Sequence, residues 1–177
     1  MSVSKWLMGC VVAVAVCVGL SGCGDGDGVD NGNGNTGGSG AGDVYLTCKV
    51  NGKSVRIDGL GCVVANYQTK EMETVVQTGG PQQYRFVIAI PGKTTGSWSL
   101  GDGYLSLSVT EMDAMSVYMS SRDYEDQGAS LRVSVSSFGS VGGYVHGTFS
   151  GTVVNQMGST TLVVTDGVFH ASRIADI

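Results

Sequence analysis

The chain contains two histidines, His146 and His170, which are the side chains best suited to acid–base or metal chemistry. A zinc site needs three or four His, Cys or carboxylate ligands at defined spacing. Asp166 accompanies His170, and nothing in the sequence links that histidine to His146. No Gly-x-Ser-x-Gly nucleophile motif occurs either. We therefore interpret both as surface or edge histidines, and we predict that the chain has no catalytic residue, no cofactor and no histidine-based metal site.

Aromatic side chains offer a second kind of chemistry, because exposed rings can form a platform for sugars. The candidates are spread along the chain, and packing in the core or on a strand face is the favoured interpretation for each of them. They are Tyr67, Trp98, Tyr104, Tyr118 and Tyr124.

The N-terminus has the pattern of an export signal. One positive charge, Lys5, precedes an apolar run from Trp6 to Leu20. A membrane-spanning helix needs about 20 apolar residues, so this run has the length of a signal-peptide core instead. The alternative is a short membrane anchor that is never cleaved.

Residues Leu20-Ser21-Gly22-Cys23 directly follow the apolar run. They resemble the lipobox of bacterial lipoproteins, which is an aliphatic residue, two small residues and a cysteine. The resemblance implies that residues 1–22 are a lipoprotein signal peptide, removed before Cys23. It also implies that Cys23 carries the lipid that holds the protein on a membrane. Two or more acyl chains give stable anchoring. Gly24 follows the cysteine, so in a Gram-negative host we expect the outer membrane rather than the inner one.

The segment after the lipobox is polar. Residues 24–43 contain nine glycines, so they cannot bury enough surface to offset their conformational entropy. We predict that residues 23–43 form a lipidated cysteine followed by a flexible tether. The spacing of Asp25, Asp27 and Asp30 suggests calcium binding as a weaker alternative, although the downstream bidentate carboxylate of a calcium loop is missing.

Two cysteines remain beyond Cys23. Cys48 and Cys62 lie fourteen positions apart in a chain that we expect to be exported. An even pair of cysteines in an oxidising compartment suggests a structural disulfide. Two buried free thiols are the alternative.

Composition bounds the function of the whole chain. The formal net charge is −5 and the basic residues are scattered. Nucleic-acid binding needs clustered basic residues that neutralise phosphates, so this class of partner is not expected. Residues 44–177 have the mixed composition of a single domain.

These 134 residues alternate apolar and polar side chains at a period of two, which predicts strands. Asn51-Gly52 is a type I′ turn signal that sets Cys48 opposite Val55 and Leu46 opposite Ile57. Asp166-Gly167 is read as another turn. About ten short strands separated by glycine-rich turns predict an all-β domain, either an antiparallel β-sandwich or a small barrel.

The C-terminal sequence from Val145 to Val153, followed by Thr165-Asp166-Gly167-Val168-Phe169, is similar to the ending of uncharacterised bacterial lipoproteins. That resemblance implies an all-β fold and supplies no catalytic residues. The expected function is a membrane-anchored lipoprotein of the cell envelope that binds a protein or carbohydrate ligand of unknown identity and is not an enzyme. The alternatives are a hydrolase whose site is assembled from separate loops, and a structural surface lipoprotein.

Overall fold

The computed structural model describes residues 44–157 and 159–177, which form eleven strands and one short 3-10 helix. The all-β class predicted from the alternation is confirmed. In chain order the elements are β1 (Tyr45–Val50), β2 (Lys53–Asp58), β3 (Val63–Gln68), β4 (Glu73–Thr78), β5 (Tyr84–Pro91), β6 (Gly96–Ser99), β7 (Ser106–Glu111), β8 (Ser116–Ser120), η1 (Arg122–Gln127), β9 (Ser130–Phe138), β10 (Tyr144–Asn155) and β11 (Thr161–Arg173).

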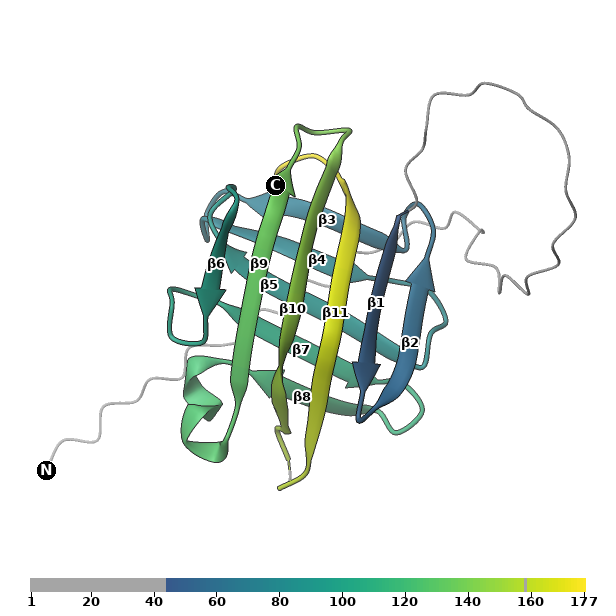
Figure 1. Ribbon diagram of the computed structural model, residues 1–177, viewed down its shortest axis with the longest axis vertical. Helices are drawn as coiled ribbons and strands as arrows, with labels where there is room; N and C mark the ends of the chain where they lie inside the picture. Colours follow the sequence, from purple (N-terminus) through teal and green to yellow (C-terminus); the bar gives the residue numbers. More distant parts are fainter. Residues whose placement is uncertain (1–43, 158) are drawn as a thin grey trace, which may run out of the picture.

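The strands are arranged in two layers (Figure 1). The front sheet has the order β2-β1-β11-β10-β9-β6, and the back sheet has the order β3-β4-β5-β7-β8. In Figure 1 the front strands run from top to bottom, while the back strands run from side to side behind them. This is the orthogonal kind of sheet packing, in which strands that continue from one sheet to the other form the corners.

Two corners join the layers. At one, β11 pairs in parallel with β3 through Ser172 and Val64. At the other, β10 pairs with β8 through Val154 and Met119. The eleven strands of the described residues therefore form one mixed, mostly antiparallel sheet. Strands β11, β3, β4, β5, β7, β8 and β10 make a near-barrel ring within it. The sequence predicted an antiparallel sandwich or a small barrel, and the parallel β11–β3 pair at the corner is the exception to antiparallel pairing.

The first hairpin has the predicted register. Cys48 pairs with Val55 and Leu46 pairs with Ile57. Asn51 and Gly52 have φ values of 49° and 80°, as a type I′ turn requires. The turn is also held from outside, because the Asn51 side chain accepts a hydrogen bond from the amide of Val163 on β11 at 2.8 Å.

The turn predicted at Asp166-Gly167 is wrong. Both residues lie inside β11, which runs for 13 residues and pairs with β1 on one side and β10 on the other. Asp166 has a φ of 53°, and the registers of β11 with both neighbours shift close to it. The local Asp-Gly signal therefore marks a bulge, because pairing on both edges keeps the strand continuous.

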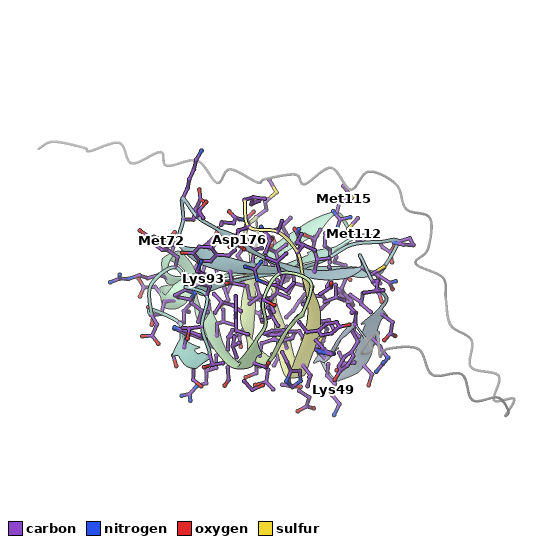
Figure 2. The ribbon with its side chains drawn as sticks, turned by 90° about the horizontal axis from the view of Figure 1, so that it is seen from above. Lys49, Met72, Lys93, Met112, Met115 and Asp176 are labelled. Atoms are coloured by element: carbon purple, nitrogen blue, oxygen red, sulfur yellow. The ribbon has the colours of Figure 1, made fainter. Side chains whose placement is uncertain are left out.

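The core lies between the two sheets. Phe86 from the back sheet and Phe169 from the front sheet are fully buried. Phe149 lies between them, with ring centroids 6.2 Å from Phe86 and 6.3 Å from Phe169. Burying each such side chain stabilises the fold by about 1.5–3 kcal/mol. Figure 2 shows the layers from above, with Lys49 on the front side and Met112 among the labelled side chains of the opposite side.

Candidate functional site

The two cysteines expected to form a disulfide lie at different levels of the fold. Cys62 follows Gly59, whose amide donates a hydrogen bond to the carbonyl of Val44 at the start of β1. Cys48 lies four residues beyond Val44 on that strand, so these two backbone positions are roughly 13 Å apart. Cys48 is a free, buried thiol, so the predicted Cys48–Cys62 disulfide is wrong. Burial raises the pKa of the Cys48 thiol to about 12.

Several predicted site residues lie outside the described part of the chain. They are the lipidation site Cys23 and the calcium candidates Asp25, Asp27 and Asp30. The signal peptide 1–22 and the tether 23–43 also lie there. All of these stay predictions.

The structure brings the two histidines together. β10 and β11 form a long antiparallel pair in which His146 lies directly opposite His170. Their ring centroids are 5.7 Å apart, with an interplanar angle of 85°. Both rings are half-buried on the outer face of the front sheet, the side that faces away from the core. Both histidines thus lie on the outer surface of the sheet, and the structure adds that they are neighbours, which the sequence did not indicate.

Two tyrosines complete a group that we call the ring cluster: Tyr45, Tyr144, His146 and His170. The Tyr144 ring lies 4.6 Å from the His170 ring, and the Tyr45 ring approaches it edge-on at 5.9 Å. Tyr45 is the register partner of His170 on β1. The cluster thus spans three neighbouring strands, and His170 lies at its centre.

Polar partners hold the rim of the ring cluster. The hydroxyl of Ser136 on β9 lies 2.9 Å from Nδ1 of His146. On the other side, the guanidinium of Arg56 lies 5.1 Å from the centroid of the Tyr45 ring, a cation–π distance. Asp58 pairs with this arginine at 2.7 Å. These contacts restrict the orientation of the outer side chains.

A groove adjoins the ring cluster on the same face. We call it the hydroxyl groove; it has a volume of about 690 Å³, and six of its lining residues carry hydroxyl groups. The outward-facing lining residues come from β6, β9, β10 and β11, and they are Ser97, Ser99, Arg132, Ser134, Thr148, Ser150, Thr165, Asp166 and Val168.

Strand register explains why these hydroxyl groups share one face. Ser97 pairs with Ser134, Ser134 pairs with Thr148, and Thr148 pairs with Val168. The row therefore crosses four strands in a line. The next row along β10 and β11 contains His146 and His170, two residues or roughly 7 Å further on. The hydroxyl groove and the ring cluster are thus neighbouring parts of one surface.

Irregular strand geometry produces the groove. The register of β10 with β9 shifts at His146–Gly147, and that of β10 with β11 shifts at Phe149–Gly151. A Cβ atom at Gly167 would lie 2.4 Å from the Phe149 carbonyl oxygen, so only glycine allows this approach of β11 to β10. Bulges of this kind bend a strand and increase its twist.

Charge in the groove comes from two side chains. Arg132 is exposed on β9, and its neighbourhood on this face is otherwise hydroxyl-rich. Asp166 forms an ion pair with Lys49 of β1 at 2.9 Å. Both partners of this pair are largely exposed, so it contributes about 0–1 kcal/mol to stability. The ion pair instead fixes the position of the Asp166 carboxylate at the edge of the groove.

The aromatic residues considered as a sugar platform do not gather in one place. Tyr118 is buried, Trp98 packs against the core from β6 while lining the groove, and Tyr104 is exposed in the loop before β7. Tyr67 stacks under Lys93 on the other layer, and Tyr124 lies in η1. The rings that do gather, Tyr45 and Tyr144, were not among the predicted candidates. The sequence held one signal for them. Alternation places Tyr144 on the same face of β10 as His146, and Tyr45 on the outward-facing side of β1.

Comparisons with known proteins found no matching family model, no similar curated protein and no similar solved structure. The described residues contain no helix long and apolar enough to cross a membrane. Within that same part of the chain, no three His, Cys, Asp or Glu side chains are gathered as metal ligands. Function is accordingly inferred from the chemistry of the front face.

Proposed function

We propose that this protein is a lipid-anchored, non-enzymatic binding module of the cell envelope, and that it binds a hydroxyl-rich glycan on the outer face of its front sheet. The observation that carries the binding proposal is the hydroxyl groove with the ring cluster beside it. A groove of about 690 Å³ is in the usual size range for small-ligand sites.

The side chains of this face suit a polar ligand. Serine and threonine hydroxyls both donate and accept hydrogen bonds, as glycan hydroxyls do. Ser97 and Ser134 already donate and accept in this way across strands, at 2.9 Å. Tyr45 and Tyr144 supply rigid amphipathic rings at low entropic cost, a combination with serine that also characterises antibody binding surfaces. Arg132 adds a charged donor within the groove.

The anchoring part of the proposal depends on the lipobox resemblance at Leu20–Cys23. A mass spectrum of the membrane-extracted protein tests it. We expect a chain that begins at a lipid-modified Cys23, and loss of both processing and membrane association in Cys23→Ala. An unmodified chain still beginning at Met1 would refute this part and leave the binding proposal unaffected.

Binding is tested with matched arginine variants of the full chain. Arg132 and Arg85 are both exposed strand residues, but they lie on the outer faces of opposite sheets. A panel of neutral and acidic oligosaccharides and insoluble peptidoglycan serves as the probe. Losing a charged hydrogen bond costs about 1.5–3 kcal/mol, so Arg132→Ala should weaken binding at least tenfold. Arg85→Ala should leave it unchanged. Equal loss in both variants, or no binding to any glycan, would contradict the proposal.

A further inference from the structure

The cross-strand histidine pair contains both imidazole side chains of the chain. His146 and His170 lie opposite each other on β10 and β11, with their centroids 5.7 Å apart. The inner neighbours of the pair, Val145 and Ala171, are fully buried. The backbone at this point is therefore fixed by core packing, and the two imidazoles are held near each other before any ligand arrives.

This spacing suits a shared metal ion. Consider an ion bound about 2.1 Å from one nitrogen of each ring, with a nitrogen–metal–nitrogen angle that is tetrahedral or somewhat wider. The two ring centroids would then lie roughly 5–6 Å apart. The observed 5.7 Å falls within that range. Rotation of the two rings about their side-chain torsions would turn one nitrogen of each ring toward a common ion.

Ser136 supplies the supporting contact that metal-binding histidines usually have. Its hydroxyl donates to the backbone carbonyl of His146 at 3.4 Å. When Nδ1 of His146 carries the ring proton, the Ser136 oxygen accepts a hydrogen bond from it at 2.9 Å. In this tautomer Nε2 of His146 carries the lone pair that binds a metal ion.

We propose that His146 and His170 bind a divalent late transition-metal ion, of the class that includes Zn²⁺, Ni²⁺ and Cu²⁺. Imidazole nitrogen is a ligand that these ions prefer over Mg²⁺ or Ca²⁺. The two imidazoles leave other coordination positions to water, as in sites whose metal stays open to exchange or to a further ligand. This site goes beyond the proposed glycan binding and does not depend on it.

Isothermal titration of the untagged full chain in detergent with Zn²⁺ and with Ni²⁺ tests the site. We expect one ion per chain, and affinity at least tenfold lower in His146→Gln and in His170→Gln. Removing a supporting hydrogen bond typically costs 10–100-fold in metal affinity, so Ser136→Ala should fall about tenfold. Ser108→Ala, on β7 of the back sheet, is the control serine and should bind the metal ion normally. Near-UV circular dichroism establishes that each variant is folded.

A second measurement needs no substitution. In the proton NMR spectrum of the unmodified chain, substoichiometric Cu²⁺ should broaden the imidazole signals of both histidines together. Because a histidine binds metal in its neutral form, acidification should reverse the effect. Broadening of one histidine alone, or unchanged affinity in the double variant His146→Gln/His170→Gln, would overturn the proposal.

Discussion

The front and back sheets of this domain bury similar apolar side chains between them but differ in their regularity. Each pair of neighbouring strands within the back sheet has an unbroken register. The front sheet contains three register shifts, together with glycines at positions 147, 151 and 167 inside its strands. The shifts on β10 and the glycine at 167 lie beside the hydroxyl groove. The comparison indicates that irregular strand geometry shapes the face that we propose as the binding surface, while the back sheet is regular.

The side chains on the outer faces of the two sheets also differ. On the back sheet, one outer row consists of Val64, Gln77, Val87, Ser108 and Met119, which are small or flexible side chains without a shared chemistry. On the front sheet, the corresponding rows gather hydroxyl groups and rings. Variants at the corner, in the front sheet, in the core and at the rim of the groove test this contrast, from the largest expected effect to the smallest.

The corner where β11 leaves the front sheet should be the most sensitive point. Arg173 is 3% exposed, forms an ion pair with Asp176 and lies 5.4 Å from the Phe138 ring centroid. Asp176→Asn leaves the buried guanidinium without a counter-charge, so we expect a loss of about 3 kcal/mol in the free energy of unfolding. Urea denaturation measures it. A loss below 1 kcal/mol would show that this ion pair does not hold the two sheets together.

Gly147 tests the irregular geometry itself. A Cβ atom there would lie 2.4 Å from both the Ser134 carbonyl oxygen and the Phe169 ring. Gly147→Ala should therefore destabilise the domain by about 2–3 kcal/mol through overpacking. It should also weaken ligand binding, because His146 and Thr148 flank the substitution. Ser108→Ala on the regular back sheet is the control and should change stability by less than about 0.5 kcal/mol. Equal effects would remove the distinction between the sheets.

Cys48 gives the core a measurable pH dependence. Its pKa is raised by burial from 9.0 to about 12, so above pH 9 the unfolded chain loses this proton before the folded chain does. Stability should then fall with rising pH between about 9 and 12, by at most about 1.4 kcal/mol per pH unit from this thiol. Cys48→Ala should lack this contribution. The native thiol should also resist alkylation at pH 8, and peptide mapping that finds Cys48 rapidly modified would contradict its burial.

The ion pair between Lys49 and Asp166 should have the smallest effect. Both side chains are largely exposed, in contrast to Arg173 at the corner. Lys49→Ala should change the free energy of unfolding by less than about 1 kcal/mol. A larger change in a urea titration would mean that the rim of the hydroxyl groove contributes to the stability of the fold.

The register of the first hairpin could be predicted because Asn51-Gly52 fixes the turn and alternation fixes the faces. The same local reasoning failed at Asp166-Gly167, where pairing with two neighbouring strands outweighs a turn signal. The disulfide predicted between Cys48 and Cys62 failed for another reason, because an even number of cysteines in an exported chain does not say how far apart they lie in the fold. The pairing of His146 with His170 depends on the register across the β10–β11 connection, which no short pattern in the sequence specifies.

The front face as a binding surface is tested most directly by mapping a ligand onto backbone amides. A bound oligosaccharide titrated into the isotope-labelled chain should shift the NMR signals of Ser97, Arg132, Thr148 and His170. The signals of Gln77 and Ser108 on the back sheet should stay in place. Shifts confined to the back sheet, or none with any glycan of the panel, would contradict the account.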